Sequence, residues 1–140
     1  MGDKNKANFA FGVGDNTYQA VGQEEGIVRL VDSFYATMAA EEQYSAIWQM
    51  HSAPPDISRA RLSAFLCGWM GGPRRYQEQF GSIQIPRAHA SLDIGHEEAK
   101  LWLACMRSAL ETLGHCDELV EYLMIQFAVP AERIRQVCQR

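Results

Sequence analysis

The segment 27-IVRLVDSFYATM-38 decides the fold class, because its apolar residues repeat with the period of a helix. Counted from Ile27, they fall at i, i+3, i+4, i+7, i+8 and i+11. This spacing is typical of an amphipathic helix with one face in a core, and it predicts a helix over about residues 23–39. Tyr35 belongs to the stripe, so its side chain is expected to point inward.

Similar patterns on both sides of this segment predict further helices. A short helix over 41–49 is followed by a break at Pro54-Pro55, and the next helix stops at Gly71-Gly72-Pro73. The helix after Pro55 is expected to turn inward Leu62, Phe65, Leu66, Trp69 and Met70. A helix over 96–113 is expected to turn inward Trp102, Cys105, Met106, Ala109, Leu110 and Leu113. A last helix before Pro130 is expected to turn inward Leu119, Tyr122, Leu123 and Phe127, and a terminal turn is expected to reach about residue 138.

Capping residues are predicted where polar side chains precede these stripes. Thr17 is expected to cap a short helix that ends at Gly22, and Asp56 or Ser58 to cap the helix that follows Pro55. No segment alternates with a period of two residues. The sequence therefore predicts an all-α fold of five or six helices.

Length and composition limit the possible functions. The chain has 140 residues, of which 47% are hydrophobic and 21% charged, as expected of one globular domain. We expect a flexible N-terminal arm over 1–15 and a domain over 16–140. The net charge of −4 argues against nucleic-acid binding. No apolar run suits a signal peptide or a membrane span, which predicts a cytoplasmic protein without a membrane partner.

The four cysteines show no Cys-x-x-Cys spacing and no Cys-x-x-Cys-His sequence. They are interpreted as free thiols, mostly in the core, and covalent haem attachment is not indicated. A reducing cytosol fits this pattern.

Residues 73–95 form an unusually long stretch without helical or strand periodicity. Its apolar residues, such as Ile83 and Ile94, require a cover, and a flat apolar cofactor whose metal is bound by His89 would supply one. The alternative is that His89 is a surface histidine or a hydrogen-bonded core histidine. His96 is interpreted as a solvated residue in a first helical turn and His115 as a residue at a helix C-terminus, while His51 stays ambiguous.

Tyr35 and Trp102 both lie on apolar faces and carry a hydrogen-bond donor that needs a partner when buried. Each donor can bond to a backbone carbonyl. The functional alternative is that both donate to a bound ligand with negative charge, such as dioxygen bound to ferrous iron.

Several motifs together resemble the group II truncated haemoglobins. They are Phe34-Tyr35, IWQMH at 47–51, FLCGWMGGPRRY at 65–76, RAHASLDIG at 87–95 and LWLACM at 101–106. The resemblance covers about residues 17–127, and the motifs occur in the family's order with matching spacings.

The resemblance implies a truncated globin, a two-over-two helical sandwich that encloses a non-covalently bound haem b. It implies that His89 is the proximal iron ligand and that Tyr35 and Trp102 are distal donors, with His51, Ser58 and Leu62 in the distal pocket. His51 then either hydrogen-bonds Tyr35 or binds the iron itself when no gas is present. Further haem contacts are expected from Phe34, Phe65, Leu66, Trp69, Ile94 and Met106, while the candidates for the haem propionates are Arg75, Tyr76 and Arg87.

The chain departs from the family around the proximal histidine. Ala88 stands where a basic residue is common, with Arg87 one position earlier, and the usual Gly-His-Pro-Arg is replaced by Gly81-Ser82-Ile83-Gln84. These changes put the propionate contacts in question.

The implied function is reversible binding of dioxygen, and also of carbon monoxide and nitric oxide, at a five-coordinate iron. Two donors would slow oxygen release, which argues against simple transport and suits scavenging, sensing or redox chemistry. The alternatives are a haem peroxidase or nitric-oxide dioxygenase with an unidentified reductase, or a helical interaction module without a cofactor. We expect a monomer or a weak homodimer.

Overall fold

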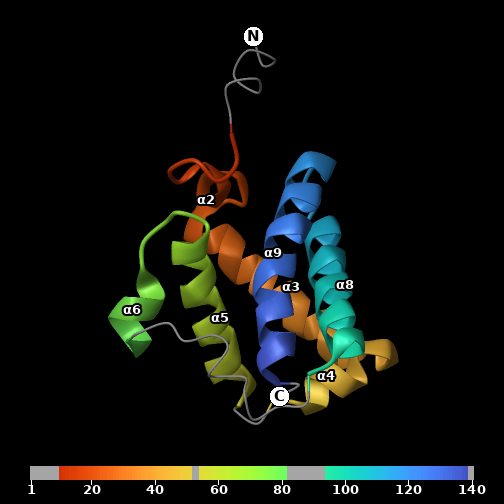
Figure 1. Ribbon diagram of the computed structural model, residues 1–140. Helices are drawn as coiled ribbons and strands as arrows, with labels where there is room; N and C mark the ends of the chain where they lie inside the picture. Colours follow the sequence, from red (N-terminus) through yellow and green to blue (C-terminus); the bar gives the residue numbers. More distant parts are fainter. Residues whose placement is uncertain (1–9, 52–53, 82–93, 139–140) are drawn as a thin grey trace.

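The computed structural model describes residues 10–51, 54–81 and 94–138, and these ranges contain no strand (Figure 1). Its helices are, in chain order, α2 (Asn16–Ala20), α3 (Gln23–Ala40), the 3₁₀ helix η1 (Glu42–Tyr44), α4 (Ser45–Gln49), α5 (Pro55–Trp69), α6 (Arg75–Phe80), α8 (His96–Thr112) and α9 (Asp117–Cys138). The all-α class is confirmed, although the described ranges hold seven α-helices where five or six helices were predicted.

Two pairs of helices make up the body of the molecule. α3 packs against both α5 and α8, and α8 packs against α9. In Figure 1, α8 and α9 run side by side in opposite directions, and α3 crosses behind α9. The result is the expected arrangement of two helices over two.

The core forms where the predicted apolar stripes meet. All six predicted residues of α3 are buried, and on α8 the buried residues are Cys105, Met106, Ala109 and Leu110. Burying a large apolar side chain fully stabilises the fold by roughly 1.5–3 kcal/mol, so these stripes hold the helices together. Leu113 was expected inward and is 36% exposed, because α8 ends at Thr112 and Leu113 is its C-cap.

α9 is longer than the sequence predicted. Leu119, Leu123 and Phe127 are buried as expected, whereas Tyr122 is only partly buried. The predicted stop before Pro130 is wrong, since Pro130 lies inside α9. A proline removes one helical hydrogen bond, but good helix formers follow it, and the Glu132–Arg135 ion pair spans the next turn.

The predicted caps are also wrong. Thr17 lies inside α2 and is buried, and its hydroxyl accepts a hydrogen bond from the Gly12 N–H at 2.9 Å. Asp56 and Ser58 lie inside α5, which begins with Pro55 in its first turn and has Pro54 as its N-cap. A proline at this position loses no helical hydrogen bond, so the helix starts without a polar cap.

The turn after α5 depends on glycine. Gly71 has φ +94°, and a Cβ there would lie 2.1 Å from the carbonyl oxygen of Gly14. This close approach joins the end of α5 to the segment before α2, and within α2 the Tyr18 N–H donates to the Met70 carbonyl at 3.0 Å. α6 follows, within the stretch that was expected to lack regular structure; residues 82–93 of that stretch lie outside the described ranges.

Candidate functional site

Aromatic side chains from four helices form a connected series through the core. We define the aromatic series as Tyr35, Phe34, Trp102, Phe127 and Trp69. The ring centroids are separated by 5.2 Å for Tyr35–Phe34, 5.2 Å for Phe34–Trp102, 5.4 Å for Trp102–Phe127 and 4.5 Å for Phe127–Trp69. Residues far apart in the sequence are thus brought together, and the two predicted distal donors, Tyr35 and Trp102, both contact the ring of Phe34.

Tyr35 and Trp102 keep their donors unused. Tyr35 is 5% exposed, and within the described ranges neither its hydroxyl nor the Trp102 indole N–H makes a hydrogen bond. Burial raises the pKa of Tyr35 from 10.0 to about 12, with a smaller opposing effect of the Arg59 charge. The phenol therefore stays protonated at neutral pH and available as a donor, and the expected alternative of backbone partners is not found among these residues.

Cys105 fixes the position of α8 against α3 beside these donors. Its thiol donates to the Phe34 carbonyl at 3.4 Å, and its side chain is fully buried. Burial raises the pKa of the Cys105 thiol to about 12, which keeps it neutral and unreactive. The prediction that cysteines are mostly in the core holds for Cys67 and Cys105, whereas Cys116 is exposed.

His51 lies next to Tyr35 but does not make the predicted hydrogen bond to it. Its Nδ1 is 2.9 Å from the Ile47 carbonyl oxygen, and its ring stands edge-on to Tyr35 with centroids 5.4 Å apart. A carbonyl only accepts, so Nδ1 carries the proton, and in the neutral ring the Nε2 lone pair is left free. Trp48 is a second ring neighbour, at 6.3 Å.

The predicted haem-pocket residues of α5 are spread along the whole helix. Ser58 and Leu62 are partly buried, and Leu66 is fully buried in the core. Phe65 stacks on Trp69 with centroids 6.3 Å apart. From the other predicted haem contacts, Phe34 and Met106 are fully buried, and Ile94 is partly buried just before α8.

Two of the residues predicted to contact the haem propionates, Arg75 and Tyr76, lie in α6. Arg75 pairs with Glu24 at 3.3 Å and with Glu78 at 3.2 Å, which ties α6 to the start of α3. Tyr76 contacts the Phe80 ring at 5.2 Å. Arg87 and His89 lie outside the described residues, so their assigned roles stay predictions.

Arg59 belongs to the site but carries no signal in the sequence. Its Nε is the one buried side-chain nitrogen or oxygen without a hydrogen bond in the described ranges, and it lies 3.8 Å from the Asp32 carboxylate, one turn before Tyr35. Its charge favours ionisation of Tyr35 and so opposes the effect of burial. Arg59 also lies 3.8 Å from Asp56 within α5, and no sequence pattern marks its contact with α3, because that contact is tertiary.

Within the same ranges, no helix is both long enough and apolar enough to cross a membrane, and no three metal-binding side chains gather in one place.

Comparisons with known proteins agree with this architecture. A family model described as bacterial-like globin matches residues 16–135. The Group 2 truncated hemoglobin YjbI of Bacillus subtilis (strain 168) is 30% identical over 119 residues, which cover 84% of this chain and 86% of that protein.

Solved structures with the same fold are also similar in sequence. The Group II 2-on-2 hemoglobin of Agrobacterium tumefaciens has a TM-score of 0.79 and 27% identity, covering 85% of this chain and 92% of that one. A truncated oxygen-avid haemoglobin from Bacillus subtilis has a TM-score of 0.75 and 28% identity, with 84% and 97% covered.

Proposed function

The chain belongs to the bacterial-like globins and is a group II truncated haemoglobin, and from this membership we propose that it binds dioxygen reversibly on a non-covalently held haem b. Membership in a globin family implies haem binding. The particular gas, the residues that contact it and a cytoplasmic location are our proposals.

One observation carries the proposal. Tyr35 and Trp102 contact the same fully buried ring, Phe34, and neither donor has a hydrogen-bond partner among the described residues. Neither donor atom is fully buried, because Arg59 Nε is the one fully buried side-chain nitrogen or oxygen without a partner in the described ranges. Two donors that reach the edge of the core beside the same ring, without a protein partner there, support a ligand that accepts from both. This donor set fits a haem pocket that takes a polar gas.

The chain's own residues are assigned as follows. His89 would hold the iron, and apolar contacts would come from Phe34, Phe65, Leu66, Trp69, Ile94 and Met106. When bound, haem would supply an iron centre able to take a diatomic gas. Since Arg75 is already engaged by two carboxylates, Arg87 and Tyr76 are our preferred partners for the propionates.

The distal donors set the affinity. A hydrogen bond to a charged group contributes about 1.5–3 kcal/mol, so two bonds to a gas that carries negative charge slow its release by several powers of ten. The oxygen-avid relative supports a high affinity for oxygen here. Carbon monoxide and nitric oxide are further expected ligands.

A second candidate function is redox chemistry as a peroxidase or nitric-oxide dioxygenase. The aromatic series favours it, because contacting rings lead from Tyr35 to Trp69 at the other side of the core. Such an enzyme needs a source of electrons, either a reductase or a small molecule.

Oxygen release tests the proposal. Trp102→Phe and Tyr35→Phe should each raise the oxygen dissociation rate by roughly 10- to 100-fold, the loss of about 1.5–3 kcal/mol. Stopped-flow mixing of the oxygenated protein with carbon monoxide measures this rate. Carbon monoxide dissociation is the control, because that ligand carries little charge and should respond much less. Equal acceleration of both gases would indicate a steric gate in place of hydrogen bonding.

Turnover separates the two candidate functions. A gas binder consumes peroxide or nitric oxide only once per haem, whereas an enzyme continues when a reductant is supplied. Purified protein without a Soret band would reject both candidates.

A further inference from the structure

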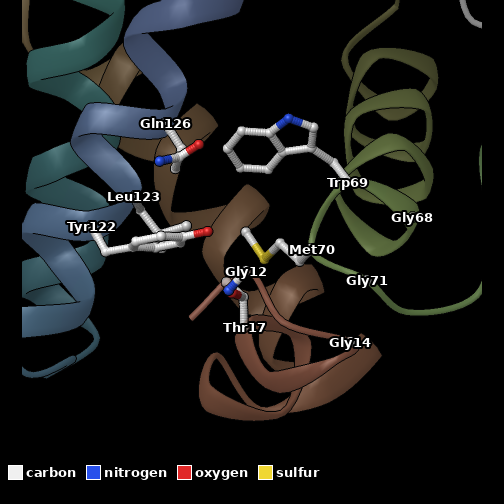
Figure 2. Close-up of a pocket in the computed structure, with 10 residues that line it drawn as sticks. All are labelled: Gly12, Gly14, Thr17, Gly68, Trp69, Met70, Gly71, Tyr122, Leu123 and Gln126. Carbon is white, nitrogen blue, oxygen red and sulfur yellow. The ribbon is translucent and has the colours of Figure 1, made fainter. Parts of the chain in front are cut away.

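A cavity of about 250 Å³ lies between the segment before α2, the end of α5 and the first half of α9 (Figure 2). Its rim includes Gly12, Gly14 and Gly71, which are exposed, and its inner wall includes the buried Met70 and Leu123. The cavity therefore reaches from solvent to the core.

One side chain belongs both to this cavity and to the aromatic series. Trp69 lines the cavity, as Figure 2 shows, and its ring stacks on Phe127 at 4.5 Å and on Phe65 at 6.3 Å between centroids. Phe127 in turn contacts Trp102 at 5.4 Å. A molecule in the cavity would thus lie one indole ring away from the predicted haem pocket.

The polar groups of the cavity are neutral and mostly unused. In Figure 2 the side chains of Tyr122, Gln126 and Thr17 border the same space as Trp69. Among the described residues, neither the Tyr122 hydroxyl nor the Gln126 amide makes a hydrogen bond, and Thr17 uses only an acceptor position, for Gly12 N–H. None of the ten labelled residues is charged.

Glycine keeps this space open. Gly12 has φ +84°, and a Cβ there would lie 2.5 Å from the Tyr122 hydroxyl oxygen. Any larger residue would push the Tyr122 ring from its place. The lack of a side chain at this position leaves the hydroxyl facing the opening, where it can meet a ligand.

We propose that this cavity binds a neutral single-ring quinol, which donates electrons through Trp69 to the haem. The ring would lie against the indole face, and its hydroxyl groups would bond to Tyr122 and Gln126. The described lining residues carry no charge, and this together with the small volume disfavours dinucleotides, whose phosphates need cations. This inference rests on the proposed haem-binding function and supplies its redox alternative with an electron donor.

The redox step balances with the quinol as the only reductant. One quinol reduces two ferric haems, each to the ferrous state, in successive one-electron steps, and becomes the quinone. Its two hydroxyl protons leave to water through the exposed rim. Trp69 lies in the path of the electrons and is unchanged at the end.

Binding is tested on the haem-loaded carbon monoxide form, with hydroquinone as the probe. The chain has three tryptophans, so a ¹H–¹⁵N spectrum contains three indole N–H signals, and Trp69→Phe and Trp48→Phe assign them. Hydroquinone should shift the Trp69 signal in a saturable manner and leave the Trp48 signal in place. Tyr122→Phe and Gln126→Leu should each weaken binding by about 2- to 10-fold, the loss of one hydrogen bond. Gln49→Leu, on exposed α4 surface, is the matched control and should bind as wild type.

Electron transfer is tested by anaerobic reduction of the ferric protein, with carbon monoxide trapping the ferrous form. The rate should saturate with hydroquinone concentration, and Trp69→Phe should lose the saturating phase while Trp48→Phe keeps it. A rate that is linear in hydroquinone, an unmoved Trp69 signal, or unchanged affinity in both cavity variants would each overturn the inference. Failure of the proposed function is distinct, because it appears as the absence of a Soret band and of a carbon monoxide adduct.

Discussion

The two ends of the aromatic series lie in opposite surroundings. At one end, Tyr35 is 5% exposed and packs on the fully buried Phe34. At the other, Trp69 borders a cavity whose rim includes the exposed Gly12 and Gly71. Hydrogen bonds and charges act more strongly where water is excluded, so the first end suits retention of a gas and the second suits exchange of a soluble molecule.

The largest expected effect is the loss of haem, which would abolish gas binding at the Tyr35 end. We predict that His89→Gly abolishes stable haem binding unless free imidazole is supplied, because His89 alone matches the family's proximal position. The Soret absorbance after gel filtration measures this. His96→Gln, in the exposed first residue of α8, is the control and should retain haem. A normal five-coordinate ferrous spectrum of His89→Gly without imidazole would contradict the assignment.

Phe127 joins the two ends, and its removal should be the most costly change to stability. It is 2% exposed and contacts both Trp69 and Trp102. Phe127→Ala should lower the free energy of unfolding by about 3–5 kcal/mol, from lost burial and the cavity left behind. Urea denaturation measures this difference. Ile125→Ala, on the same helix and 66% exposed, should change stability by less than about 0.5 kcal/mol.

The long helices of this fold were predictable from the sequence, whereas the short helix α6 and the contact made by Thr17 were not. The stripes of α3 and α8 were read from the sequence, because burial repeats over many turns and outweighs local preferences. α6 was missed because none of its six residues is buried, so it has no apolar pattern to detect. Thr17 was misassigned because its partner, Gly12, is a tertiary contact that only the turn before α2 creates.

The candidate site was predictable to a similar degree and for similar reasons. Tyr35 and Trp102 stood out as donors on apolar faces, and the structure brings both against Phe34. The contact of Arg59 with Asp32 and the cavity beside Trp69 were not predictable, since each depends on how separate helices cross. The roles of His89 and Arg87 rest on resemblance to the family, because both residues lie outside the described ranges.

The burial that distinguishes the Tyr35 end should be visible as a pH dependence of stability. The pKa of Tyr35 is raised from 10.0 to about 12, mainly by burial. The neutral phenol therefore contributes stability that is fully present below about pH 10 and is lost as the pH rises through about 12. Ionisation of this group should cost wild type about 2–3 kcal/mol over that window.

The matched measurement is the free energy of unfolding of wild type and Tyr35→Phe between pH 9 and 12. Other tyrosines and lysines titrate equally in both proteins, so the difference between them isolates Tyr35. As the pH rises, the free energy of unfolding of wild type should fall relative to that of Tyr35→Phe, so that Tyr35→Phe is the more stable protein at high pH. Parallel curves would show that the phenol is not buried in solution.

The smallest expected effect concerns His51, which borders the Tyr35 end from the exposed side. Its Nδ1–H donates to the Ile47 carbonyl at 2.9 Å, and its ring stands edge-on to Tyr35 at 5.4 Å. This bond holds the imidazole to the last turn of α4, so the ring restrains the phenol more readily than it reaches the iron. The Nε2 lone pair that is left free cannot donate to a gas.

We therefore predict that His51→Phe changes the oxygen dissociation rate by only about 2- to 5-fold, because it removes a neighbour of Tyr35 and no charge-assisted bond. The deoxygenated ferrous spectrum should be high-spin and five-coordinate in both proteins from pH 5 to 9. A low-spin six-coordinate component in wild type that weakens on acidification and disappears in His51→Phe would show that the imidazole binds the iron through Nε2. In that case the exposed side of the pocket, and not its buried donors, would limit the entry of gas.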